Sequence, residues 1–526
     1  MSDKVKPNTP IQQTISNHVG TVEDVRLKRD FGTWGILSIA WNMVNIFGGM
    51  SYIFVVGFSA GGIPSIFYGF IGSSFCVLCI MATLAECASM FPTAGGAYHF
   101  ATFLAPEKYR RYISYPLGWL NYLGWVFTIA SCSAIATGLT FSLVNLCKPE
   151  VSVTTRWQLF LVYIAWCTMA WAVNAFMLPG VGYLENFGCA ASMVGFVGFV
   201  IALLARSSKA DAAFVFKDIV NETGYSTAAM AVVLGLYNSM VAFICLDAAC
   251  HMAEELPHPA VQIPRVLYIT MATQFTVGVI YILTIGFSIT DINAIIKTPT
   301  GVPIIEVVRQ GLKSDAAAIV FNVILLINFM SSTTGAMLAS SRQGYALARD
   351  GGLFFKQALT NIQPRFMVPL QSLNLCFGLS ILIGIVYLFS TQAFNALLGA
   401  EALFMLLSYA APSLMMLIFG RAQLKTTKFS LHRLGYFCAV VAVVYTAIVT
   451  VLVMIPQVHP VTASNMNYTI LFAGIFAILC LIMWVLDARK SYKPPAFEQF
   501  VVNVAPPEDR EVFVEGDKSH HKHGVE

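Results

Sequence analysis

The stretch NIFGGMS, residues 45–51, lies at the centre of an uncharged apolar run that extends from about residue 35 to residue 57. About 20 apolar residues suffice for a helix to cross the hydrocarbon core of a bilayer. The paired glycines Gly48 and Gly49 weaken a helix and let another molecule approach its backbone. The stretch therefore predicts a membrane helix interrupted at its middle. Close packing of a neighbouring helix against these small residues is the alternative interpretation.

Similar uncharged runs recur along the rest of the chain. Of its 526 residues, 57% are hydrophobic and 11% are charged, with a mean hydropathy of +0.71, whereas a soluble domain carries about 25% charged residues. The further runs lie near residues 64–88, 113–144, 157–177, 182–205, 228–250, 264–289, 316–340, 369–390, 392–420, 433–456 and 467–487. The sequence therefore predicts an all-α membrane protein with twelve transmembrane helices.

Polar segments flank this region. We expect residues 1–31 and 489–526 to be disordered tails on either side of a membrane domain of residues 32–488, with no secretory signal peptide. Lys and Arg gather in the loops on the side of the tails, so both termini are predicted to be cytoplasmic. Asn221 begins an N-glycosylation acceptor, and this topology places it outside. We expect a multi-pass protein of the plasma membrane.

Several classes of function find no support in the sequence. The net charge of +4 is small and the basic residues are scattered, so nucleic acid is not an expected partner. The 12 cysteines form no pair with metal-ligand flanks, and no HExxH motif is present. We therefore expect no enzyme, no cofactor and no metal site.

The sixth run carries charge inside the membrane. Asp247 lies well within the apolar part, where an ionisable group is expensive unless it has a function. Asp247, His251 and Glu254 are spaced i, i+4, i+7 and share one helix face, which could bind a cation or relay protons. Alternatively, His251, Glu254 and Glu255 lie in the headgroup zone and only anchor the helix.

A second acidic residue lies in the tenth run. Glu401 is about three turns into that run, and together with Asp247 it favours a solute that carries positive charge. Aromatic rings could supply a cation–π face for an ammonium group, although each taken singly fits ordinary packing as well. The candidates are Trp41, Trp119, Trp125, Tyr237 and Phe243.

A family resemblance rests on five motifs. They are GGMS at 48–51, AECASMFPTAGGAY at 85–98, DAACHMAEE at 247–255, SRQGYALARDG at 341–351 and SYAAP at 408–412. With them, the chain resembles the amino acid, polyamine and organocation permease superfamily, and within it the fungal amino acid and choline permeases. The resemblance extends from about Phe31 to Asp487.

The resemblance implies a 5+5 inverted-repeat (LeuT-like) fold in which helices 1 and 6 are broken where they face each other. The repeats would be residues 35–205 and 228–420, with peripheral helices in 433–487. By the same resemblance, a substrate carboxylate or equivalent would meet N–H groups near Asn45, Gly48, Gly49 and Met50 at a positive helix end. Its amine would meet carbonyl groups around Phe243, Ile244 and Cys245, with Asp247 nearby.

Two departures from the family pattern affect these expectations. Members often have glycine where Cys245 stands, which puts the break in the sixth helix in doubt. Several members carry a lysine in the fifth span, and the run 182–205 has none. Proton coupling or gating would then fall to acidic residues or to His251. The candidates are Glu86, Glu185, Asp247, His251, Glu254 and Glu401.

The leading hypothesis is a secondary active, proton-coupled transporter for a small amine such as an amino acid, γ-aminobutyrate or choline. An exporter of an amine metabolite and a non-transporting nutrient sensor on the same fold are the alternatives.

Overall fold

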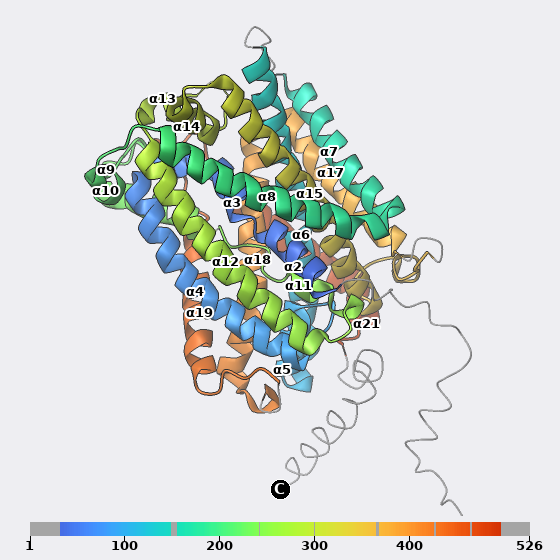
Figure 1. Ribbon diagram of the computed structural model, residues 1–526. Coiled ribbons are helices and arrows are strands. Elements are labelled where there is room, and N and C mark those ends of the chain that lie inside the picture. The colour runs from blue at the N-terminus through green and yellow to red at the C-terminus, as the bar shows by residue number, and fades with distance from the viewer. Residues whose placement is uncertain are drawn as a thin grey trace, which may run out of the picture.

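In the computed structural model (Figure 1), the described residues are 32–148, 155–240, 242–298, 300–363, 368–424, 428–462 and 465–495. Ten helices in this part of the chain are long and apolar enough to cross a membrane. They belong to α4 (Gly62–Met90), α6 (Glu107–Cys147), α7 (Arg156–Phe176), α8 (Leu178–Arg206), α12 (Pro259–Ser288), α15 (Asp315–Arg349), α17 (Leu370–Phe389), α18 (Thr391–Phe419), α19 (Leu434–Leu452) and α20 (Thr469–Met483). The predicted N-terminal tail, residues 1–31, lies outside the described residues. The predicted C-terminal tail, residues 489–526, lies outside them from residue 496 onward.

Two further apolar segments are divided. The first forms α2 (Thr33–Val44) and α3 (Ile46–Ser59), and the sixth forms α10 (Ala228–Met240) and the short α11 (Ala248–His251). The remaining short helices are α5 (Ala97–Leu104), α9 (Ala212–Phe216), η1 (Ala253–Glu255), α13 (Ile292–Ile296), α14 (Pro303–Leu312), α16 (Lys356–Leu359), η2 (Ala422–Leu424), η3 (Trp484–Ala488) and α21 (Arg489–Ser491).

Most predicted runs agree with helices to within a few residues, but two helices are longer. The run predicted at 113–144 is α6, which begins at Glu107, because Pro116 lies inside the helix and does not end it. The run predicted at 316–340 is α15, which continues to Arg349. Its last turns contain charged residues that are neutralised by ion pairs, so hydropathy alone does not reveal them.

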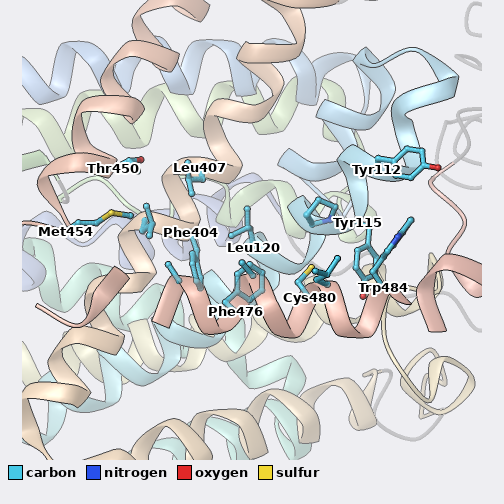
Figure 2. Close-up of a pocket in the computed structure, with 15 residues that line it drawn as sticks. Tyr112, Tyr115, Leu120, Phe404, Leu407, Thr450, Met454, Phe476, Cys480 and Trp484 are labelled. Carbon is cyan, nitrogen blue, oxygen red and sulfur yellow. The ribbon is translucent and has the colours of Figure 1, made fainter. Parts of the chain in front are cut away.

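The divided first segment lies in the middle of the bundle. In Figure 1, α8 and α12 lie in front of α2 and α3, and α6 and α18 lie behind them. Helices approach closely where residues are small: a Cβ atom on Gly188 of α8 would lie 1.8 Å from Ser331 Oγ of α15. At the C-terminal side, α20 packs on α18 through Phe476 and Phe404, whose ring centroids are 4.9 Å apart (Figure 2).

A buried ion pair joins α15 to η1. Arg342 Nε donates to Glu255 Oε1 at 2.7 Å, and both side chains are at most 3% exposed. A buried charge that loses its partner is strongly destabilising, whereas the intact pair contributes little net stability over an apolar alternative. The pair therefore acts mainly to fix where η1 sits against α15.

We predict that Glu255→Gln destabilises the protein by about 3–5 kcal/mol, because it leaves the Arg342 guanidinium buried without a counter-charge. The measurement is the thermal unfolding midpoint of the detergent-solubilised protein. Asp315→Asn is the matched control, since Asp315 pairs with Arg309 at the surface and such pairs contribute about 0–1 kcal/mol. An equal midpoint for Glu255→Gln and Asp315→Asn would contradict this role.

Candidate functional site

The first break occurs at Asn45. This residue has φ 41° and ψ 50°, a left-handed conformation that asparagine tolerates better than most residues. Its Oδ1 accepts a hydrogen bond from the Gly48 N–H at 3.0 Å and so caps α3. The interruption therefore lies three residues before the predicted Gly48–Gly49 position, because the asparagine side chain provides the cap and both glycines are inside α3.

A glutamine of α12 bridges the break. Gln274 Oε1 accepts from the Ile46 N–H at 3.2 Å, and Gln274 Nε2 donates to the Trp41 carbonyl at 2.9 Å. The amide thus serves one backbone group on each side of Asn45. Sequence reasoning missed Gln274, although a lone glutamine within the apolar run 264–289 was a visible signal.

Ser332 of α15 is hydrogen-bonded to the opposite side of the break. Asn45 Nδ2 donates to Ser332 Oγ at 3.0 Å, and Ser332 Oγ donates to the Asn42 carbonyl at 2.7 Å. The two glycines differ in their surroundings: a Cβ on Gly48 would lie 2.3 Å from Asn328 Oδ1, whereas one on Gly49 would meet no atom within 4 Å. Gly49 therefore borders open space, while Gly48 and the buried Met50 are packed.

The second break covers residues 242–247, between α10 and α11. Cys245 has φ 66°, in the left-handed region that favours glycine. The chain therefore turns at this position even though the residue is not glycine. The Phe243 ring stacks on Phe70 at 5.0 Å and 27°, and Ile244 is half-buried.

Asp247 lies at the end of this break and is fully buried. Its Oδ1 accepts from Tyr409 Oη at 2.6 Å, and its Oδ2 accepts from Asn121 Nδ2 at 3.0 Å. Its Oδ2 also lies 2.9 Å from His251 Nε2. Helices α6 and α18 thus hold one carboxyl group against α11. Within the described residues, no lysine or arginine forms an ion pair with it.

The contacts of His251 define where its protons lie. Its Nδ1 is 2.7 Å from the Ala94 carbonyl oxygen, which can only accept, so Nδ1 carries a proton. Its Nε2 accepts from Trp125 Nε1 at 2.8 Å, because an indole N–H can only donate. Nε2 also lies 2.9 Å from Asp247 Oδ2, so the imidazole connects Trp125, Asp247 and the Ala94 carbonyl.

Glu401 of α18 is a second buried carboxyl group. Thr128 Oγ1 donates to its Oε1 at 2.9 Å, and Ser131 Oγ donates to its Oε2. Cys245 Sγ lies 3.9 Å from Oε1, so Glu401 reaches the second break directly. The described residues provide no basic partner for it.

Glu185 of α8 faces the helix that precedes the first break. Its Oε2 accepts from Asn42 Nδ2 at 2.7 Å, and its Oε1 has no hydrogen-bond partner among the described residues. The side chain is fully buried. Within the part of the chain that the structure describes, it is a third buried acidic group without an ion-pair partner.

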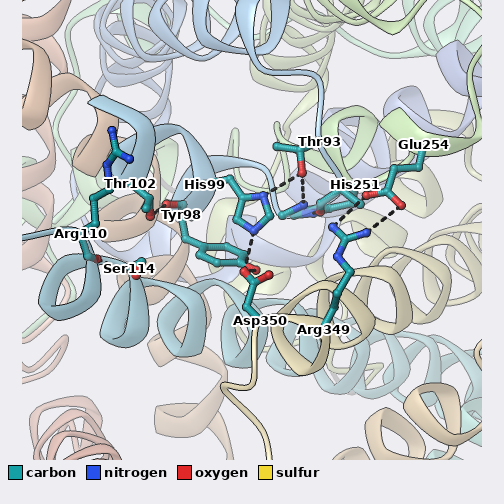
Figure 3. Close-up of polar contacts among 12 residues, drawn as sticks. Thr93, Tyr98, His99, Thr102, Arg110, Ser114, His251, Glu254, Arg349 and Asp350 are labelled. Carbon is teal, nitrogen blue, oxygen red and sulfur yellow. Dashed lines mark hydrogen bonds and ion pairs between the residues drawn. The ribbon is translucent and has the colours of Figure 1, made fainter. Parts of the chain in front are cut away.

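Two other predicted acidic residues are ion-paired with arginine. Glu86 pairs with Arg421 and accepts from the Leu431 N–H at 2.9 Å. Figure 3 shows Arg349 reaching Glu254, with distances of 3.0 Å and 3.2 Å between their nitrogen and oxygen atoms. These contacts connect separate elements, α4 with the segment after α18 and η1 with α15.

The polar cluster of Figure 3 continues beside this pair. His99 Nε2 and Tyr98 Oη both lie 2.9 Å from Asp350 Oδ2, and His99 Nδ1 lies 2.7 Å from Thr93 Oγ1. The motifs 85–98 and 341–351 thus meet in space.

The predicted glycosylation site is exposed. Asn221 lies between α9 and α10, and its Oδ1 accepts from Thr223 Oγ1 at 2.7 Å. Modification of Asn221 stays a prediction.

A family model described as amino acid permease matches residues 31–477. The chain belongs to the amino acid permease family. This membership confirms the resemblance seen in the motifs, and the permease is a membrane transporter rather than an enzyme.

Three relatives of the permease cover most of its length. A protein named choline transporter, from Saccharomyces cerevisiae, is 31% identical over 89% of this chain and 83% of its own. The swainsonine transporter swnT of Arthroderma benhamiae is 28% identical over 89% and 93%. The 7-keto 8-aminopelargonic acid transporter of S. cerevisiae is 26% identical over 88% and 93%.

We predict opposite outcomes for alanine at the two neighbouring glycines. Gly48→Ala destabilises the protein by about 1–3 kcal/mol, because its methyl group would overlap the Asn328 and Asn45 side chains. Gly49→Ala raises stability by up to about 1 kcal/mol, because the methyl group enters open space and alanine favours the helix more than glycine does. Thermal unfolding of the two purified variants measures the difference, and equal midpoints would contradict the described packing.

Proposed function

We propose that this permease is a secondary active, proton-coupled transporter of a small amine-bearing solute, such as an amino acid, γ-aminobutyrate or choline. The observation that carries the proposal is Asp247, a buried carboxyl group at a helix break, bound by hydroxyl, amide and imidazole groups. A carboxylate in this position attracts an ammonium group and disfavours a free anion. The relative named choline transporter supports the same chemistry.

The solute would bind between the two breaks. Its ammonium group would lie near Asp247 and the carbonyl groups of residues 243–245, and Glu401 would lie close by, since its Oε1 is 3.9 Å from Cys245 Sγ. A carboxylate or equivalent would approach Asn45, Gly48, Gly49 and Met50. Because Asn45 Oδ1 occupies the Gly48 N–H, an anionic group bound there would replace that amide oxygen.

We propose that each divided segment counts as one span, which makes twelve with the ten long helices. The inverted repeats would be residues 35–205 and 228–420, and α19 and α20 would be peripheral. In this topology both termini are cytoplasmic and the protein lies in the plasma membrane. The breaks in the first and sixth segments support the repeat, since they are five spans apart.

Coupling would use one proton held jointly by Asp247 and His251, whose Oδ2 and Nε2 atoms lie 2.9 Å apart. When an ammonium group reaches Asp247, the carboxyl proton moves to His251 Nε2, which leaves a carboxylate beside the ammonium and a cationic imidazole. Trp125 Nε1–H then loses its acceptor, so the transfer is accompanied by a change in the contact between α6 and α11. Solute and proton are in this way bound together.

Gating would use the ion pairs on the side of α5. Opening a path past η1 would separate Glu254 from Arg349. The Arg349 side chain is exposed, which lowers the free energy needed to break this ion pair. Glu86 and Arg421 would hold α4 to the loop after α18 in the same manner.

The first test is Asp247→Asn. Loss of a buried charge contact of about 2 kcal/mol or more corresponds to a decrease in uptake of about 30-fold or more. Uptake of labelled choline and γ-aminobutyrate is measured with competition by a panel of amines, and surface labelling shows that the variant reaches the membrane. Asp315→Asn, an exposed charge on α15, serves as control. Normal uptake by Asp247→Asn would remove this residue from the mechanism.

A second test separates coupling from binding. His251→Gln keeps an oxygen that can accept from Trp125 but has no group that takes up a proton. In proteoliposomes, we expect a pH gradient to drive at least about tenfold less accumulation by this variant than by wild type, while exchange of internal and external solute continues. Undiminished proton-driven accumulation by His251→Gln would show that the coupling proton lies elsewhere, with Glu185 and Glu401 as the next residues to vary.

A further inference from the structure

A long apolar groove lies between α6, α18, α19 and α20, apart from the central site. Its volume is about 520 Å³, and fifteen residues line it, none of them charged. Figure 2 shows Phe476, Cys480 and Trp484 in a row along one wall, with Tyr112 and Tyr115 at the Trp484 end and Met454 at the other.

The groove opens to the surroundings of the bundle. Two of its lining residues, Tyr112 and Leu481, are more than 60% exposed. The opposite face of α20 is exposed as well, for example at Ile478. Since α20 is one of the candidate membrane spans, the molecules that reach this opening are lipids. An apolar cavity excludes water and accepts apolar groups, so an acyl chain fits it.

One end of the groove carries polar groups that lack partners. Tyr115 lines the groove and is 2% exposed, yet its hydroxyl group forms no hydrogen bond with the described residues. Arg111, one residue before Tyr112, has a buried Nε with no partner in the same part of the chain. The Arg111 Nε–H can only donate and the Tyr115 hydroxyl group can donate, so one acceptor could serve both groups.

The chain forms an unusual turn at this end. The residues Trp484–Ala488 form a π-helical turn, η3, and such turns often occur at functional sites. The Arg111 guanidinium lies 5.3 Å from the Trp484 ring, and its Nη2 donates to the Ala488 carbonyl at 3.0 Å. Trp484 also contacts Tyr115, with ring centroids 5.0 Å apart. These contacts hold the guanidinium at the groove's end, where its Nε has no partner among the described residues.

Positive charge surrounds this end. Arg489, Lys490 and Lys493 follow η3 and are exposed, while the nearby acidic Asp487 accepts from Ser491 Oγ at 3.1 Å. Basic residues next to a membrane helix attract anionic lipid headgroups. The neutral hydroxyl group of a sterol would not neutralise the charge of Arg111.

We propose that the groove is a binding site for one anionic phospholipid, with an acyl chain along α20 and its phosphate at Arg111 and Tyr115. Arg111 Nε and Tyr115 Oη donate hydrogen bonds to phosphate oxygens, and such charge-assisted bonds are stronger than neutral ones. The bound chain fills the space between α20 and the bundle. The proposal depends on the membrane location alone and not on which solute is transported.

The proposed lipid would also affect the central site, because α18 contacts both the groove and that site. Leu403, Phe404 and Leu407 line the groove, whereas Glu401 and Tyr409 of the same helix contact α6 and Asp247. A chain in the groove therefore supports α18 against the face that holds the buried acids. Transport by delipidated protein should then depend on anionic phospholipid.

The test uses the purified, delipidated full-length protein with phosphatidylglycerol, phosphatidylcholine or a sterol added back. Native mass spectrometry counts bound lipid, and the thermal unfolding midpoint gives an independent readout. We expect one phosphatidylglycerol to bind at least about tenfold more tightly than phosphatidylcholine and to raise the midpoint. Both readouts are separate from transport, so they decide the proposal even if the assigned solute is wrong.

Two matched pairs of variants locate the site. Ala477→Trp fills the groove and should abolish the retained lipid, whereas Ile478→Trp places the same ring on the exposed face and should not. Arg111→Gln should remove the preference for phosphatidylglycerol, whereas Arg309→Gln at the surface should keep it. Equal binding of both phospholipids, binding of sterol in their place, or lipid retention by Ala477→Trp would each overturn the proposal.

Discussion

The hydrocarbon core of a bilayer contains no water, so every backbone group freed by a helix break must find its partner inside the protein. This constraint explains the surroundings of Asn45. The side chains of Asn45 and Gln274 serve the groups that the break releases, and Ser332 holds the preceding turn. A break that left several backbone groups without hydrogen bonds would be too unstable to form. Because the Asn45 and Gln274 amides provide those bonds, the chain can be non-helical at the centre of the bundle.

The same constraint governs the buried acids. Asp247 is placed by groups from α6, α11 and α18, so three elements must be in register before its two oxygens are satisfied. Within the described residues none of these partners is a permanent cation, which distinguishes Asp247 from Glu255 and its arginine. An acid held only by neutral donors and an imidazole can exchange a proton or accept a cationic ligand with little rearrangement. An acid paired with arginine holds its element in place instead.

Local features of the sequence were sufficient to predict the apolar spans and the unusual charges at Asp247 and Glu401. They were not sufficient for the partners, since Asn121, Tyr409 and Gln274 act across 126, 162 and 228 residues of chain. No periodic pattern connects positions on different helices. The first break shows a different difficulty: the glycine pair is the conspicuous local feature, but the asparagine before it supplies both the left-handed conformation and the cap.

Helix α18 connects the two regions of interest. Residues 401, 405 and 409 are four apart and share a face, and Tyr409 Oη lies 3.5 Å from Met405 Sδ. Residues 403, 404 and 407 face the groove beside α20. One face of α18 therefore contacts α20 and the groove, and another contacts the residues around Asp247, so the proposed lipid site and the proposed solute site share this helix.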